Sequence, residues 1–143
     1  HFLSPEEFRS KIENDEFLEW EEVYAGTYYG TLKSEVDRIR NNGNHVIFDV
    51  DVVGGCNIKK YYGDPALAIF VQPPSVEELR NRLVSRSTDA PEVIEKRVAK
   101  AEYELTFADK FDVVIVNDDL AKACNEAEMR IQEFISLPFQ ATS

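Results

Sequence analysis

The chain has 143 residues, of which 43% are hydrophobic and 30% are charged, and its formal net charge is −11. These values are typical of a globular protein with one domain, or one domain and a small appended lobe. The negative charge argues against nucleic acid as a partner, although a small phosphate ligand needs only two or three cations. No apolar run is long enough to cross a bilayer, and Cys56 and Cys124 lack metal-ligand spacing. We therefore expect reduced thiols in a cytoplasmic protein without a membrane partner.

The first part of the sequence predicts a helix, a hairpin and a second helix. A capping box at residues 4–7 predicts a helix over 5–14. Alternating apolar residues then predict a hairpin with strands 16–24 and 27–29. The second helix is expected over 32–42, where a glycine ends the pattern.

Three later segments have the nearly continuous apolar pattern of strands that are buried on both faces of a parallel sheet. These segments are 45–53, 66–72 and 113–117. Helices are expected after the second strand, capped by Ser75, and after the third, capped by residues 117–119. A long helix over 89–108, with Asp89 as its N-cap, is interpreted as an excursion from the sheet. Strands that alternate with helices indicate a parallel α/β sheet.

Two aspartates interrupt the first of these strands near its carboxyl end, where open α/β sheets bind their ligands. Asp49 and Asp51 are alternate residues, so they share one face of the strand. Carboxylates in an apolar strand are costly unless they pair with cations, a metal or ligand donors. The pattern indicates either a solvated strand end or a site for Mg²⁺-bound water or a ligand donor.

The predicted hairpin carries a second group of candidate residues. Glu19 alternates with apolar neighbours and is either a solvated strand residue or an inward-facing carboxylate. An inward carboxylate could accept two hydrogen bonds from the N1–H and N2–H₂ edge of guanine, a pattern that adenine lacks. Tyr29 and Thr31 add hydroxyl groups, and Gly30 permits close approach of the backbone. Taken alone, these three residues are only a hairpin end.

Arginines border the apolar stripes of two predicted helices. Arg82 and Arg86 lie three residues beyond members of one stripe, and Arg97 does so on the next helix. Such arginines could face a cleft, where Arg86 and Arg97 would converge on the charge of a transferring phosphate. The alternative is that they form salt bridges with the many acidic residues.

Seven short strings are distributed along nearly the whole chain. They are Phe2-Leu3-Ser4-x-x-Glu7-Phe8, Glu16-Phe17-Leu18-Glu19-Trp20, Tyr28-Tyr29-Gly30-Thr31, Phe48-Asp49-Val50-Asp51-x-x-Gly54, Ile69-Phe70-x-x-Pro73-Pro74-Ser75-x-x-Glu78-Leu79-x-x-Arg82-Leu83, Arg86-x-Thr88 with Arg97, and Val114-Ile115-Val116-Asn117-Asp118-Asp119-Leu120. In this order and spacing the strings resemble the guanylate kinase family. Each string alone is weak evidence, whereas seven together are specific.

The resemblance implies an enzyme that transfers the γ-phosphoryl group of ATP to GMP, giving ADP and GDP. It implies that Glu19 and Thr31 hold the guanine, with Asp51 near its exocyclic amine. By the same resemblance, Tyr29 would donate a hydrogen bond to the GMP phosphate.

The resemblance also implies residues for catalysis and for ATP. Asp49 would lie near Mg²⁺ and its waters, and Arg86 and Arg97 would reach the phosphates from a mobile lid. Asn117 would lie on the adenine side, so that ATP would be bound by Asn117 and Arg86.

The fold that the resemblance implies is an α/β, P-loop-kinase-type parallel sheet flanked by helices, with a small GMP-binding lobe and a helical lid. The lobe would cover 1–43, the core 44–76 and 112–143, and the lid 77–111. The P-loop motif G-x-x-x-x-G-K-[ST] does not occur in the chain. The first strand and the P-loop would therefore be missing, and we expect a truncated chain that is marginally stable and inactive alone.

Two other functions are compatible with parts of this pattern. A non-catalytic guanylate-kinase-like module would use the GMP pocket to bind a protein partner, often a phosphopeptide. The enzyme is favoured, because the chain retains the expected residues Glu19, Tyr29, Thr31, Asp49, Asp51, Arg86 and Arg97. A kinase for another base is disfavoured, because Glu19 would face the acceptor N1 of adenine without a matching donor. The sequence indicates no particular protein partner.

Overall fold

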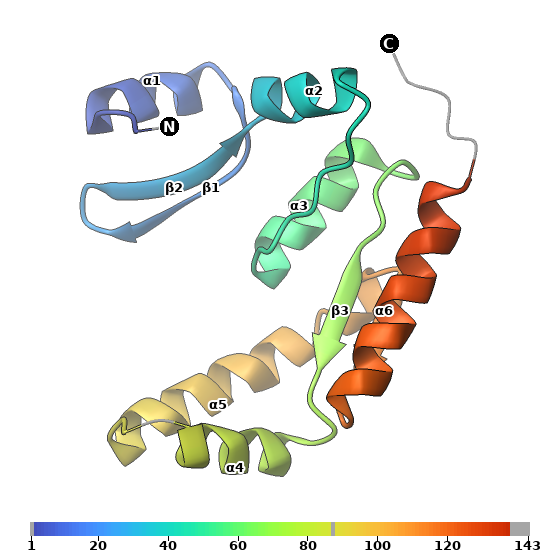
Figure 1. The fold of residues 1–143 in the computed structure, drawn as a ribbon. Coiled ribbons are helices and arrows are strands. Elements are labelled where there is room, and N and C mark those ends of the chain that lie inside the picture. Colours follow the sequence, from blue (N-terminus) through green and yellow to red (C-terminus); the bar gives the residue numbers. More distant parts are fainter. Residues whose placement is uncertain (1, 87, 138–143) are drawn as a thin grey trace. The chain divides into compact units, whose positions relative to one another are not determined.

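The computed structural model describes residues 2–86 and 88–137, except for the side chains of residues 23 and 24, and divides into the units His1–Gly63 and Asp64–Ser143. Among the described residues, the first unit contains an antiparallel pair of strands and the second a parallel pair. Both units also contain helices (Figure 1). The chain is therefore a mixed α/β protein, as the sequence predicts.

The first unit begins with helix α1 (Pro5–Glu13) and a hairpin of strands β1 (Phe17–Tyr24) and β2 (Thr27–Leu32). The predicted cap is confirmed, because the Ser4 hydroxyl accepts a hydrogen bond from the backbone N–H of Glu7 at 3.1 Å. The buried Phe8 ring of α1 stacks on Phe17 and Tyr28, with ring centroids 4.2 and 5.1 Å apart. Helix α1 thus covers one face of the hairpin.

A register shift between Phe17 and Glu19 marks a β-bulge in β1. Phe17 packs toward α1, whereas Leu18 joins Val36 of α2 (Lys33–Asn41) and Ile58 of α3 (Val52–Tyr62) in a buried cluster. A bulge changes which side of a strand its residues face. The hairpin is consequently attached to α1 by one face and to the α2–α3 core by the other.

The strand predicted over 45–53 is not formed, which corrects the sequence-based expectation. Residues 44–51 pair with no strand among the described residues, and residues 52 and 53 already belong to α3. Val46, Phe48 and Val50 pack against the core of the first unit, while Ile47 is 85% exposed. The first part of the apolar run therefore packs on one side only, and its last two residues form the first turn of α3.

The second unit contains the parallel strands β3 (Ile69–Gln72) and β4 (Val113–Val116), which confirms two of the predicted strands. Helix α6 (Leu120–Ile135) contributes Ala123 to a buried cluster with Val113 and Ile115 of β4. Its predicted capping region is also confirmed, because the Asp119 carboxylate accepts from the N–H of Lys122 at 3.2 Å. Val114 and Val116 are exposed on the other face of β4, where the cross-strand partner of Val114, Phe70, is buried, so this face is only partly covered.

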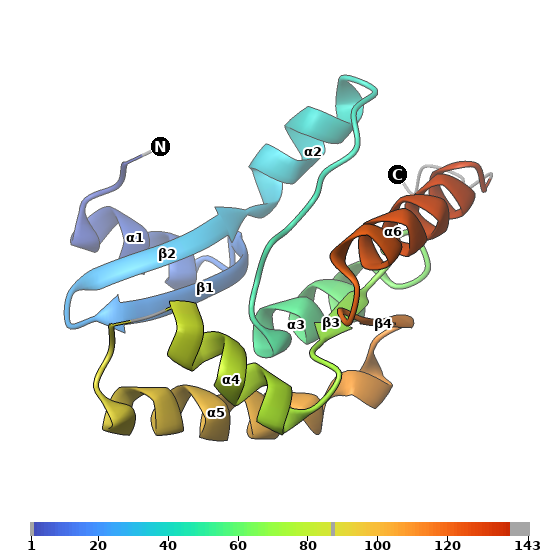
Figure 2. The ribbon, with the colours of Figure 1, turned by 60° about the horizontal axis from the view of Figure 1, so that its bottom comes forward.

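Helices α4 (Val76–Arg86) and α5 (Pro91–Leu105) form a helical hairpin between the two strands in the sequence (Figure 2). The Ser75 hydroxyl caps α4 by accepting from the N–H of Glu78 at 3.0 Å, as predicted. Helix α5 differs from the prediction, because its N-cap is Ala90 and not Asp89. Pro91 fixes the start of α5, since proline is favoured at the first helical position.

Within the described ranges, the structure contains no helix with the length and apolar character needed to span a membrane.

Candidate functional site

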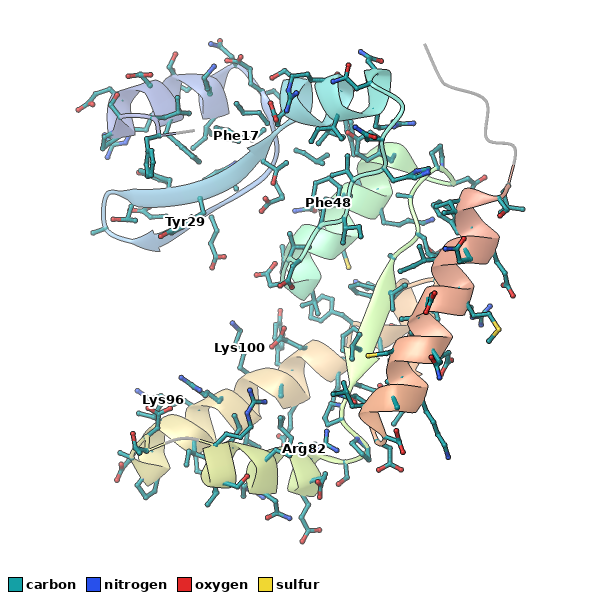
Figure 3. All side chains as sticks on the ribbon, in the orientation of Figure 1. Phe17, Tyr29, Phe48, Arg82, Lys96 and Lys100 are labelled. Carbon is teal, nitrogen blue, oxygen red and sulfur yellow. The ribbon has the colours of Figure 1, made fainter. Side chains whose placement is uncertain are left out.

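The hairpin face opposite α1 joins the carboxylate of Glu19 to the hydroxyl of Thr31. These residues are cross-strand partners, and Thr31 Oγ1 donates a hydrogen bond of 2.8 Å to Glu19 Oε1 in a partly buried contact. Glu21 and Tyr29 form the next cross-strand pair on this face, two residues along each strand. Figure 3 shows Tyr29 on this side of the hairpin and Phe17 on the side of α1.

The arrangement leaves hydrogen-bonding capacity for a ligand. A carboxylate offers about four lone-pair sites, and Thr31 occupies one of those of Glu19. Tyr29 is 64% exposed, and its hydroxyl forms no hydrogen bond with a described residue. This face can therefore accept hydrogen bonds from paired N–H groups and donate one to an anion.

Gly30 is explained by packing inside the hairpin. A Cβ atom at this position would lie 2.9 Å from a ring carbon of Phe17, 2.9 Å from Trp20 Cβ and 2.8 Å from the carbonyl oxygen of Glu19. Real Cβ atoms essentially never approach so closely. Glycine is thus required where Phe17 lies against β2, which is a structural reason that the sequence did not reveal.

Asp49 and Asp51 alternate with the packed residues Phe48 and Val50, and both are exposed. Asp51 is the N-cap of α3, where its Oδ1 accepts from the N–H of Gly54 at 2.8 Å. This bond fixes the carboxylate and leaves Oδ2 available. Asp49 forms no hydrogen bond or ion pair with a described residue. In the part of the chain that the structure describes, no three His, Cys, Asp or Glu side chains gather as a metal site would require.

The second unit holds the two arginines that were predicted to converge on phosphates. Arg97 Nη2 lies 3.3 Å from Asp89 Oδ2, so Arg97 forms one of the salt bridges that the alternative interpretation expected. Arg86 is exposed at the end of α4 and is joined to no described residue by a hydrogen bond or ion pair. Residue 87, which lies between them in the sequence, is outside the described residues, and their convergence stays a prediction.

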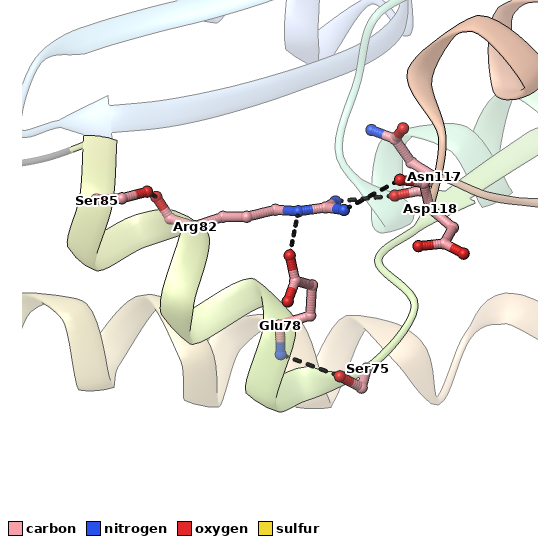
Figure 4. A network of polar contacts seen from close by, with 6 residues as sticks. All are labelled: Ser75, Glu78, Arg82, Ser85, Asn117 and Asp118. Carbon is pink, nitrogen blue, oxygen red and sulfur yellow. Dashed lines mark hydrogen bonds and ion pairs between the residues drawn. The ribbon is translucent and has the colours of Figure 1, made fainter.

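Arg82 has the most extensive contacts of the arginines in the described part of this unit (Figure 4). Its Nε donates to Glu78 Oε1 at 3.1 Å, its Nη1 to the carbonyl of Asn117 at 2.8 Å, and its Nη2 to the carbonyl of Asp118 at 3.5 Å. The sequence indicated either a cleft-facing arginine or one that forms salt bridges with acidic residues. The spacing of Glu78 and Arg82 by four residues was a signal for the first contact, but nothing local signalled the other two.

The comparisons with known proteins assign the family. The guanylate kinase family model matches residues 1–134. The chain belongs to the guanylate kinase family.

Particular relatives agree with this assignment. Guanylate kinase of Bacteroides thetaiotaomicron is 66% identical over 135 residues, which are 94% of this chain and 66% of that protein. Guanylate kinase of Porphyromonas gingivalis is 59% identical over 136 residues, 95% of this chain and 72% of that protein. The crystal structure of guanylate kinase from Anaplasma phagocytophilum has a TM-score of 0.68 and 26% identity, covering 95% of this chain and 65% of that one. The chain thus spans about two thirds of the length of these proteins.

Proposed function

We propose that the protein to which this chain belongs transfers the γ-phosphoryl group of ATP to GMP, giving ADP and GDP. The observation that carries this proposal is the partly buried Glu19 carboxylate, oriented by the Thr31 hydroxyl at 2.8 Å. Relatives with 59% identity or more are guanylate kinases, which supports an enzyme over a non-catalytic binding module.

In this proposal the first unit binds GMP. The free lone pairs of Glu19 accept from guanine N1–H and N2–H₂, and Thr31 keeps the carboxylate in place. Asp51 Oδ2 lies toward the exocyclic amine, while Oδ1 stays on the N–H of Gly54. The Tyr29 hydroxyl donates to the phosphate. Adenine is rejected because its N1 is an acceptor and would leave the Glu19 carboxylate without a donor.

The second unit contributes the ATP side and the lid. We infer that the α4–α5 hairpin, within the predicted lid 77–111, brings Arg86 and Arg97 to the phosphates in a P-loop-kinase fold. Asp89 holds Arg97 through one oxygen, so most N–H groups of this guanidinium stay available for phosphate oxygens. Asn117 contacts ATP on the adenine side, and Arg86 contacts its phosphates.

Mg²⁺ would accompany ATP. This ion keeps several waters and usually binds through one or two carboxylates and the substrate phosphates. An exposed carboxylate without a partner among the described residues fits such a role, and Asp49 is the one that the family resemblance indicates. When bound, the ion would neutralise negative charge on the phosphates. Asp49 would orient the waters of the ion and would not form a cage around it.

The proposal concerns a polypeptide that also contains a P-loop, because the motif does not occur in these 143 residues. We expect the chain alone to show no turnover, since ATP would lack the backbone cradle and the lysine of that motif. A cytoplasmic location without nucleic-acid or membrane partners is part of the proposal.

A coupled assay of the full-length protein tests the function. We expect ADP release from ATP to depend on GMP. With AMP as the acceptor, kcat/KM should be at least about a hundredfold lower than with GMP. Binding of GMP without GMP-dependent release of ADP would instead indicate a non-catalytic module.

A further inference from the structure

We propose that Arg82 is a positioning residue that fixes the loop after β4 to α4 and thereby places the ATP-binding side chains Asn117 and Arg86. This inference rests on the proposed function for the roles of Asn117 and Arg86. The contact itself rests on the geometry of the second unit.

The three contacts of Arg82 use all three nitrogens of its guanidinium. One nitrogen is held by Glu78 within α4, and the other two point to consecutive carbonyls of the loop, those of Asn117 and Asp118 (Figure 4). A planar guanidinium donates several bonds in fixed directions, which a lysine ammonium cannot reproduce. Arg82 therefore fixes both the distance and the orientation between α4 and this loop.

The loop is placed where such a restraint matters. It follows the carboxyl end of β4, and the N–H of Asn117 still bonds to the Gln72 carbonyl at the end of β3, at 2.7 Å. Ligands of α/β sheets bind at this edge. Arg82 holds the loop by backbone carbonyls, which leaves the Asn117 side chain available to a nucleotide.

Arg86 is coupled to the same restraint through α4. It lies one helical turn beyond Arg82, and residues four apart lie on the same side of a helix. The Arg82 contacts thus join an expected adenine-side residue to an expected phosphate-side residue. Loosening these contacts should weaken the binding of ATP. The binding of GMP should stay nearly unaffected, because the residues expected to bind GMP all belong to the first unit.

Glu78 supports Arg82 from within the helix. Its backbone N–H is bonded to the Ser75 cap, and its carboxylate lies in the first turn, where the helix dipole favours a negative charge. Because Glu78 acts on the loop only through Arg82, its removal should have no effect once Arg82 is changed.

Kinetics of the full-length protein provide the first test. We expect Arg82→Lys to raise KM for ATP about tenfold, the effect of losing one charge-assisted hydrogen bond, with KM for GMP within about twofold of wild type. Glu78→Gln should raise KM for ATP about threefold in the wild-type background and not at all in Arg82→Lys. Arg80→Lys is the matched control, because Arg80 is also on α4 but pairs with Glu95. It should change neither KM.

Amide hydrogen exchange without nucleotide provides a readout that does not depend on activity. Amides of residues 117–122 should exchange at least about fivefold faster in Arg82→Lys than in wild type or Arg80→Lys. Unchanged exchange, equal rises of both KM values, or additive effects of Glu78→Gln and Arg82→Lys would each overturn the inference. If wild type itself transferred no phosphate, the proposed function would fail, and exchange alone would still decide whether Arg82 restrains the loop.

Discussion

At the scale of single residues, Tyr62 carries the clearest unsatisfied group in the described part of the chain. Its hydroxyl oxygen is buried and has no hydrogen-bond partner among the described residues. The ring packs against the cluster of Leu18, Val36 and Ile58, and the Arg40 guanidinium lies 5.6 Å from its centroid. Burial raises the pKa of Tyr62, because the phenolate would lose its hydration.

We predict that Tyr62→Phe raises the free energy of unfolding by about 1 kcal/mol at neutral pH, because a buried hydroxyl without a partner is removed. Because the pKa of Tyr62 is higher in the folded protein than in the unfolded one, protonation of Tyr62 favours folding at pH values below the unfolded-state pKa near 10. This contribution to stability is lost as the pH rises through the folded-state pKa. The advantage of Tyr62→Phe over wild type should therefore grow above about pH 10. Urea denaturation of wild type and Tyr62→Phe, at neutral pH and above about pH 10, measures this difference in free energy of unfolding.

Tyr61→Phe is the control for this prediction, because the Tyr61 ring is exposed. It should change the free energy of unfolding by less than about 0.5 kcal/mol. A loss of stability in Tyr62→Phe would show that its hydroxyl has a partner and would contradict the prediction.

At the scale of secondary-structure elements, the end of α1 is closed by a residue in a left-handed conformation. Asp15 has φ of +55°, the N–H of Glu16 bonds to the carbonyl of Lys11, and the N–H of Asp15 bonds to that of Ile12, both at 3.0 Å. This pattern is a Schellman motif, in which glycine is the preferred residue. Lys33 Nζ contacts the Asp15 carboxylate at 3.3 Å, but that carboxylate is 91% exposed, so the ion pair contributes little.

We predict that Asp15→Gly raises the free energy of unfolding by about 0.5 kcal/mol, because relief of left-handed strain exceeds the loss of a surface ion pair. Asp15→Ala removes the same carboxylate without relieving the strain, so it should be about 1 kcal/mol less stable than Asp15→Gly. Equal stabilities of the glycine and alanine variants would refute the strain argument. Thermal and chemical denaturation of the three proteins makes the comparison.

Elements with local start signals could be predicted from the sequence. Ser4, Ser75 and Asp119 each cap the helix that they were expected to begin. Helix α3 could not be predicted, because a continuous apolar run has the same pattern in a two-sided strand as in a one-sided segment followed by a helix. The start of α5 was wrong by one residue, since Asp89 pairs with Arg97 while proline sets the helix boundary.

The candidate site could be predicted only where spacing carries the information. Alternation indicated that Glu19 could face inward. The structure joins it to Thr31, which lay beyond the predicted strand 27–29. The contact of Arg82 with the carbonyl of Asn117 spans 35 residues and has no local signal. Backbone acceptors are present in every residue, so a bond to one of them cannot be read from side-chain identities.

At the scale of the whole molecule, the exposed apolar residues of β3 and β4 bear on stability. Val71, Val114 and Val116 are exposed in the structure of these 143 residues. A two-stranded parallel sheet whose faces are only partly covered buries little apolar surface, and parallel sheets are normally covered on both faces. This agrees with the expectation that the chain alone is marginally stable, which stays a prediction.

The central claim about the whole enzyme is that Glu19 selects guanine, and steady-state kinetics of Glu19→Gln in the full-length protein test it most directly. Glu21→Gln is the matched control, because Glu21 is exposed two residues along the same face and is paired with Tyr29. We predict that Glu19→Gln raises KM for GMP about a hundredfold and KM for ATP less than about twofold, because only guanine donates to this carboxylate. Glu21→Gln should leave both values within about twofold of wild type. Equal effects of Glu19→Gln on GMP and ATP, or equal effects of the two substitutions on GMP, would contradict the account.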